Sequence, residues 1–314
     1  MGYAIATVTG GLGDEAHYKV LAAIKTLAEA NGWTTLRYDT SGADKELILN
    51  SPGLSGTEDI YVGFKTYQSV SGDYYNIAAA GFTGYVPANP FENQPGARLC
   101  GTPCHNNAVT YFITCNAQRI AGCFKVGTPT YAHFYVGKMF PYARPGEYPA
   151  PIVSAGSFDG KELRRYSDVN YQFPYYGYYP HSSSVGGPSN VSRLYLRNQA
   201  GVWQQQYHNP FRRGPSNLRP PGTNYQLFPI VLFGDVTYQG ARNVWGELDG
   251  VRAVTGFNNG VENVLQEGGT PVDQTGMTVL QAVDAVIAAG GKAYVILQDG
   301  PRNGFNNFIA LEMK

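Results

Sequence analysis

Charge is scarce in this 314-residue sequence. Asp, Glu, Lys and Arg together make up 15% of the chain, whereas about 25% is usual in soluble domains. The 23 basic residues are balanced by 23 acidic ones, so the chain lacks the basic excess that proteins bound to phosphate backbones normally carry. Direct sequence-specific binding to nucleic acid is therefore not expected, although a local basic patch remains open.

Long hydrophobic runs are missing as well. No segment approaches the roughly 18 consecutive apolar residues of a transmembrane helix, which argues against a membrane partner. Residues 1–4 lack the basic start and the apolar run of a secretory signal. We therefore expect the chain to remain in the cytoplasm where it is made.

Catalytic motifs of the common kinds are also missing. The five histidines share no spacing, and the sequence contains no HExxH, Gly-x-Ser-x-Gly or Walker motif. Glu247 and Asp249 are two nearby acids of the kind that glycosidases use, but their glycine-flanked stretch is interpreted as a turn. We expect no enzyme activity, no catalytic residue, no cofactor and no metal site.

Cysteine is rare, and its spacing does not fit a zinc site, because no paired C-x2-C motif is present. In a predicted hairpin across residues 116–119, Cys115 would oppose Ile120 and Cys123 would oppose Phe112, so the two thiols are not cross-strand neighbours. Buried reduced thiols, and disulfides of a particle that meets oxidising surroundings, both remain open. The four candidates are Cys100, Cys104, Cys115 and Cys123.

What is present begins with a β-α-β pattern over residues 3–39. A short apolar run ends in a glycine-rich turn, apolar residues then recur at helical spacing, and a second strand follows Asn31-Gly32. Asp14 and Glu15 are expected in the first helical turn, where the helix dipole favours acids.

The same turn has the spacing of a dinucleotide-binding fingerprint. Gly11-x-Gly13-x-x-Ala16 opens the helix, and Asp39 ends the next strand. Two observations oppose this interpretation: the acids at positions 14 and 15 stand where a pyrophosphate would lie, and the β-α-β alternation stops at about residue 46. A nucleotide-binding oxidoreductase is kept as one alternative.

From about residue 46 the pattern indicates antiparallel sheet, because alternating strands follow one another across short turns. One further helix is expected at residues 277–289, ended by Gly290-Gly291. We predict an α+β, mainly β fold, in which an N-terminal β-α-β element leads into antiparallel sheet, a long loop-rich middle and a C-terminal β region. The strands expected after the β-α-β element are residues 46–49, 60–64, 74–82, 109–115, 120–126, 131–140, 228–233, 251–257, 293–298 and 307–313.

The predicted organisation has three parts. Residues 1–145 form an α+β domain with antiparallel sheet, residues 146–225 form a Tyr-, Pro- and Gly-rich loop or insertion region, and residues 226–314 form a C-terminal β region that packs on the first domain. Aromatic side chains with few charges are typical of subunit interfaces, and they also suit stacking against sugars. The candidate interface residues are Tyr171, Phe173, Tyr175, Tyr176, Tyr178, Tyr179 and Trp203.

Several short segments carry a resemblance when they are taken together. They include Gly246-Glu247-Leu248-Asp249-Gly250-Val251 and residues 52–63, 66–70, 73–76, 81–87, 125–129, 141–143 and 255–259. As a set they resemble a family of virion structural proteins of tailed bacteriophages and prophages of Gram-negative bacteria. The resemblance covers about residues 46–150 and 225–314. Residues 273–290 and the cysteines depart from the family pattern.

The resemblance implies a structural role in the virion, at the neck or collar or at the tail or baseplate, and it supplies no catalytic residue. We therefore expect a bacteriophage structural protein that assembles as a symmetric ring or sleeve of its own copies, together with other neck, tail or baseplate proteins. The virion would be its final location, after synthesis and assembly in the host cytoplasm. A receptor- or carbohydrate-binding module on the same virion is the other alternative.

Overall fold

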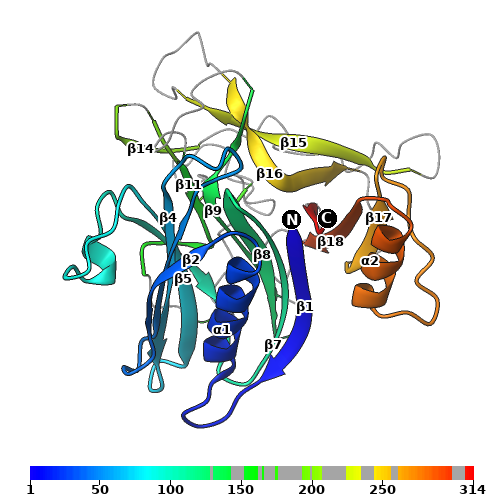
Figure 1. The fold of residues 1–314 in the computed structure, drawn as a ribbon. Helices are drawn as coiled ribbons and strands as arrows, with labels where there is room; N and C mark the ends of the chain where they lie inside the picture. Colours follow the sequence, from blue (N-terminus) through cyan, green and yellow to red (C-terminus); the bar gives the residue numbers. More distant parts are fainter. Residues whose placement is uncertain are drawn as a thin grey trace, which may run out of the picture.

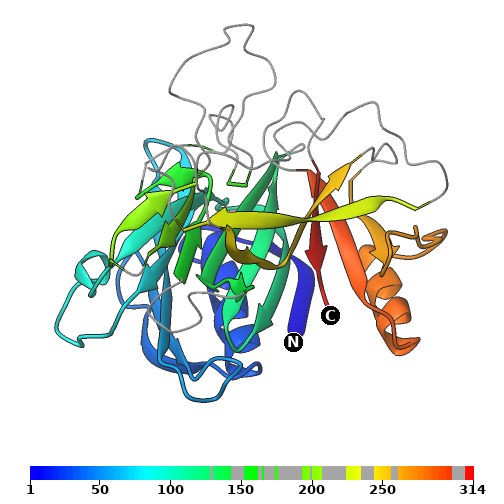
Figure 2. The same cartoon turned by 90° about the horizontal axis from the view of Figure 1, so that it is seen from above.

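The computed structural model describes residues 1–127, 130–142, 152–161, 165, 174–175, 193–198, 200–206, 224–234, 244–255, 261–298 and 308–314. These residues form three antiparallel sheets and two α-helices (Figures 1 and 2). The predicted α+β, mainly β fold class is thereby confirmed. No helix in these ranges is long and apolar enough to cross a membrane.

The central sheet has seven strands in the order β1-β7-β8-β9-β11-β13-β14. Its middle strands are buried on both faces, which explains why they carry apolar residues on both faces. The strands are β1 (Gly2–Thr9), β7 (Ala108–Asn116), β8 (Arg119–Val126), β9 (Thr130–Lys138), β11 (Ile152–Ala155), β13 (Leu194–Arg197) and β14 (Trp203–Gln205).

The second sheet, here called the N-terminal sheet, has six strands in the order β12-β6-β5-β4-β3-β2. Helix α1 (Ala16–Glu29) packs beside it with a buried stripe at helical spacing. The chain turns after the helix at Gly32, whose φ of 92° few other residues adopt. The strands are β2 (Thr34–Asp39), β3 (Glu46–Ser51), β4 (Ile60–Ser69), β5 (Tyr74–Phe82), β6 (Arg98–Pro103) and β12 (Phe158–Asp159), with a 3-10 turn η1 at Phe91–Asn93.

The third sheet, here called the C-terminal sheet, has the order β10-β16-β19-β18-β17, and β15 also pairs with β16. Helix α2 (Val279–Ala288) begins with a capping box between Thr278 and Gln281, close to the predicted helix at 277–289. The strands are β10 (Phe140–Pro141), β15 (Gln226–Phe233), β16 (Val244–Thr255), β17 (Asn263–Gln266), β18 (Ala293–Gln298) and β19 (Phe308–Glu312).

Two large cores place the central sheet between the other layers. On one face, Ile113 and Phe124 share a core with α1 and with the N-terminal sheet. On the other face, Phe112 and Cys123 share a core with the C-terminal sheet and α2. The described residues among 226–314 therefore bury apolar side chains against the central sheet.

Several of the strand pairings predicted from the sequence are confirmed. β4 pairs with β5 in an antiparallel register, and in the β7–β8 hairpin Cys115 opposes Ile120 and Cys123 opposes Phe112. The order β1-α1-β2 is also observed. Its two strands nevertheless enter different sheets, since β1 pairs with β7 and β2 pairs with β3.

The predicted loop or insertion region, residues 146–225, supplies strands as well as loops. β11, β13 and β14 extend the central sheet, and β12 adds to the N-terminal sheet. These strands complete sheets that residues 1–145 begin, so the described residues of this region belong to the same layers as the predicted first domain.

Candidate functional site

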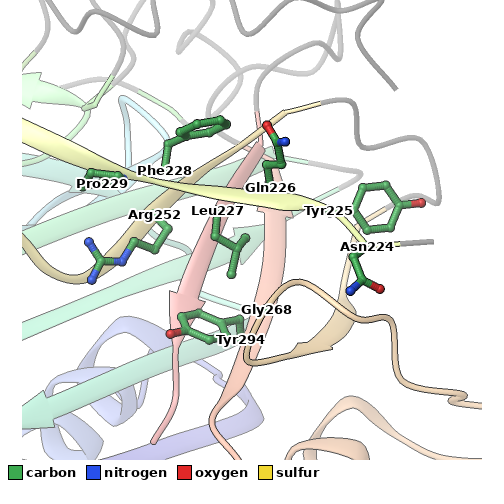
Figure 3. A pocket seen from close by; sticks show the side chains of 9 residues that line it. All are labelled: Asn224, Tyr225, Gln226, Leu227, Phe228, Pro229, Arg252, Gly268 and Tyr294. Carbon is green, nitrogen blue, oxygen red and sulfur yellow. The ribbon is translucent and has the colours of Figure 1, made fainter. Parts of the chain in front are cut away.

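An open pocket of about 720 Å³ lies on the outer face of the C-terminal sheet (Figure 3). The first half of β15 crosses it, and Arg252 of β16 and Tyr294 of β18 line it from the neighbouring strands. Tyr294 and Leu227 also belong to a small apolar core on this face. The lining residues are Asn224, Tyr225, Gln226, Leu227, Phe228, Pro229, Arg252, Gly268 and Tyr294.

The charged group of this pocket is neutralised by the protein itself. Arg252 forms an ion pair with Glu247. Burial alone would lower the pKa of Arg252. The hydrogen bond that Arg252 donates to Glu247 and the negative charges of Glu247 and Glu312 together outweigh burial, so the pKa lies above its ordinary value. Tyr294 donates a hydrogen bond to Glu312 at 3.2 Å, and burial together with that acid raises its pKa. The described lining residues thus present aromatic rings, amides and a fixed guanidinium, and none of these groups is suited to proton transfer near neutral pH.

A glycine pair shapes one wall of the pocket. Gly268 and Gly269 have φ values of 83° and 80°, a region that side chains disfavour. A Cβ on Gly269 would lie 1.7 Å from the carbonyl oxygen of Tyr225, whose backbone N–H donates to the Gly269 carbonyl at 2.8 Å. The turn therefore depends on glycine to reach the start of β15.

The glycine-rich turn before α1 does not have the geometry of a nucleotide site. The backbone N–H groups of Ala16 and His17 donate to the carbonyl oxygens of Asn106 and His105, at 3.1 and 3.0 Å. These donors at the helix N-terminus are the ones that a pyrophosphate would need. A dinucleotide-binding unit also needs parallel neighbouring strands, whereas β1 and β2 lie in different sheets.

The two acids beside that turn lie outside the helix, contrary to prediction. Glu15 is the N-cap residue, and α1 has no acid in its first turn. Glu15 accepts a hydrogen bond from the backbone N–H of Gly13 at 3.2 Å, and Asp14 pairs with Lys19 at 2.8 Å. Asp39, the expected ribose ligand, instead accepts hydrogen bonds from the backbone and hydroxyl of Ser41.

All four cysteines are buried, and none is joined in a disulfide. Burial raises the pKa of Cys100 to about 11, and that of Cys104 and Cys115 to about 12. Such thiols are protonated at neutral pH and are poor nucleophiles and poor metal ligands. Within the described ranges no three His, Cys, Asp or Glu side chains are grouped closely enough to hold a metal ion.

The burial of the cysteines gives a direct prediction for thiol chemistry. We expect a thiol reagent to modify none of the four in the native protein and all four after denaturation, because every sulfur is shielded by the core. The count should be the same with and without prior reduction. Fewer than four thiols in the unreduced, denatured sample would reveal a disulfide and contradict the structure.

Glu247 and Asp249 lie within strand β16 and not in a turn, so that prediction was wrong. Their glycine neighbours had suggested a turn, but here the glycines serve close packing. A Cβ on Gly246 would lie 2.1 Å from the carbonyl oxygen of Phe140, and one on Gly250 would lie 2.2 Å from the guanidinium of Arg119. Both acids are paired with arginine, which gives them a structural role.

Arg119 joins the central and C-terminal sheets through one of these acids. Its side chain is fully buried, and its Nε lies 3.4 Å from Asp249 Oδ2. Its Nη1 donates to Thr114 at 3.1 Å, and Asn116 donates to the same carboxylate at 2.6 Å. The Gly-Glu-Leu-Asp-Gly segment is thus a tie between two layers of the molecule.

The tyrosine-rich run is only partly described, and one member changes its interpretation. Tyr175 is 1% exposed and donates a hydrogen bond to the carbonyl oxygen of Phe134 at 3.1 Å. It is therefore a core residue, which corrects its prediction as an interface residue. Trp203 is half-buried on β14 and donates to the Gly96 carbonyl at 2.9 Å. The other candidates, Tyr171, Phe173, Tyr176, Tyr178 and Tyr179, lie outside the described residues.

Strand β1 forms an edge of the central sheet and is protected only near its end, where Lys19 of α1 donates to the carbonyl oxygen of Thr9 at 2.8 Å. It pairs along its whole length with β7, and among the described residues no strand pairs with its other side. Its sequence, Gly-Tyr-Ala-Ile-Ala-Thr-Val-Thr, contains no charge and no proline. Ala6, Thr7 and Thr9 are exposed. Natural proteins normally block such an edge with charges, proline, a bulge or a covering loop.

The other long edges of the described sheets are protected by these devices. β2 carries a bulge between Thr35 and Arg37, and Arg37 donates to the carbonyl oxygens of Pro87 and Asn89. β15 contains Pro229 and irregular registers. The remaining edge strands are short, and β17 is covered by the segment around residue 272. β1 is therefore the exception in this part of the chain.

The interpretation of the site rests on the chain's own residues. No family model matches the sequence, and no curated protein matches it. The described residues thus define a layered, antiparallel β protein with an open pocket on the C-terminal sheet and a largely unprotected edge at β1. The pocket was not predicted, because its lining residues are dispersed between positions 224 and 294. The edge could have been predicted from the sequence, because the first strand contains no charged residue.

Proposed function

We propose that this protein is a structural subunit of a tailed-phage virion, which assembles with its own copies and with other neck, tail or baseplate proteins. The observation that carries the proposal is the edge of β1, which among the described residues is covered only at Thr9, by Lys19. Unpaired main-chain donors and acceptors favour addition of a strand from another chain. The low charge and the segments that resemble virion proteins support the same role. Under this proposal the protein acts by complementary shape and hydrogen bonding, with no catalytic step.

The proposal fixes location and partners in a way that can be tested. Tailed particles from a host that carries the gene are purified through a density gradient, and this chain is quantified by mass spectrometry. We expect it to sediment with intact particles in a fixed copy number relative to the major capsid protein. Its absence from the particles, or its presence only at the top of the gradient, would contradict a structural role in the virion.

A second candidate function, carbohydrate binding on the same virion, is favoured by the pocket of the C-terminal sheet. Aromatic rings that stack on sugar faces and amides that bind hydroxyl groups are typical of glycan sites. Tyr225→Ala is expected to abolish any glycan binding, whereas Tyr38→Ala, an exposed tyrosine on β2, should leave it unchanged. A glycan array without a signal for the wild-type protein would remove this candidate.

A further inference from the structure

We infer that β1 pairs with β1 of a second copy of this chain, antiparallel and about a two-fold axis. The inference rests on the proposed assembly function and names its first contact. Within one molecule β1 uses one side for β7, and on its other side Lys19 of α1 donates to the carbonyl oxygen of Thr9 at 2.8 Å. The outward main-chain groups of Thr7 form no hydrogen bond with the described residues. Such groups gain hydrogen bonds when a strand is added.

The chemistry of this edge favours an identical partner over a different chain. An antiparallel pair of the same strand is self-complementary, because each copy offers the same donors and acceptors to the other. β1 itself has no charged residue, and Lys19, which reaches its end, is paired with Asp14 at 2.8 Å. The formal net charge of the chain is zero. A protein without net charge lacks the long-range repulsion that keeps copies apart.

The pairing is confined to the second half of the strand. Near its start, Tyr3 donates a hydrogen bond to Asp284 of α2, which leaves less room beside that half. The exposed residues are Ala6, Thr7 and Thr9. A two-fold axis at Thr7 would set Thr7 opposite the partner subunit's Thr7, and Ala6 opposite the partner subunit's Val8.

In this register the side chains on each face of β1 continue onto the same face of the second copy's strand. Odd-numbered residues oppose odd-numbered residues, so the face that packs on α1 continues as the same face in both copies. The Thr7 hydroxyl already lies 2.8 Å from that of Thr110 on β7, and the new Thr7 pair would extend this row. A hollow of about 280 Å³ on the same face, lined by Thr7, Thr110 and Lys125, leaves space for the added side chains.

The experiment is sedimentation velocity of the purified full chain, with charges placed at the two-fold axis. We expect the wild type to form a dimer. Thr7→Lys and Thr7→Glu should each be monomeric, because like charges would oppose each other across the axis. An equimolar mixture of the two variants should recover the dimer, which also shows that both are folded. Thr34→Lys, on the exposed edge of β2, is the matched control and should leave the dimer intact.

Three results would overturn the inference: a monomeric wild type, a wild-type dimer that Thr7→Lys does not disturb, or two monomeric variants that fail to associate when mixed. These outcomes are distinct from failure of the proposed function. If the chain sediments with phage particles and Thr7→Lys does so equally well, the virion role stands and the β1 pairing is wrong. If the wild type is a dimer that never enters particles, the pairing stands and the virion role is wrong.

Discussion

Asp249→Asn is expected to lower the free energy of unfolding by about 3 kcal/mol, because removal of one partner of a buried ion pair leaves the other charge uncompensated. Arg119 has no exposed side-chain surface and holds its positive charge between two sheets. Its remaining contacts, to the Thr114 hydroxyl and to the sulfur of Met1, are neutral. Urea unfolding followed by tryptophan fluorescence measures the change.

A surface ion pair provides the control for this prediction. Asp14 pairs with Lys19 at 2.8 Å, but its side chain is 70% exposed. Asp14→Asn should therefore change the free energy of unfolding by less than about 1 kcal/mol. Equal effects for the two asparagine variants would show that Arg119 does not depend on Asp249 for its charge.

Acid should destabilise the protein steeply, because two histidines are buried in their neutral form. Burial, together with the charges of Lys45 and His105, lowers the pKa of His17 to about 3, and burial lowers that of His133 to about 4. Below the ordinary pKa of 6.5 these histidines bind a proton in the unfolded chain but remain neutral in the folded chain. The free energy of unfolding therefore decreases as the pH falls from 6.5 toward the lowered pKa values of the folded state. Each histidine contributes up to about 1.4 kcal/mol per pH unit.

The two sites differ in their partners, and this separates their contributions. Neither ring nitrogen of His17 makes a hydrogen bond to a residue that the structure describes, whereas His133 Nε2 lies 2.7 Å from the carbonyl oxygen of Gln298. His17→Leu should therefore raise stability at neutral pH, since an unsatisfied buried polar group is removed, and should reduce the acid slope. Urea unfolding over a pH series tests both points. An unchanged slope in His17→Leu would contradict a neutral, buried His17.

Local pairing was predictable from the sequence because alternation fixes which residues face each other. The β7–β8 hairpin places Cys115 opposite Ile120. The length of the turn and the alternation of side chains along each strand predict this pairing. The layer order was not predictable. β7, β8 and β9 are buried on both faces, so their patterns do not tell which neighbour covers which face, and β1 pairs with a strand about a hundred residues away.

Predictions from residue type alone were wrong at positions where glycine or tyrosine can serve more than one structural role. Gly246 and Gly250 suggested a turn, but they permit close approach inside β16. Tyr175 suggested an interface, but its ring fills the core. In both places the deciding partner, Phe140, Arg119 or Phe134, is far away in sequence, and only the folded chain brings it near.

The central claim, that the edge of β1 is a joining surface, is tested most directly by amide hydrogen exchange at two protein concentrations. In dilute solution the outward amides among residues 6–9 should exchange quickly. In concentrated solution they should become protected while those of β2 remain unchanged, because only β1 gains a neighbouring strand. Fast exchange of these amides at every concentration, or protection that Thr7→Lys does not remove, would contradict the account.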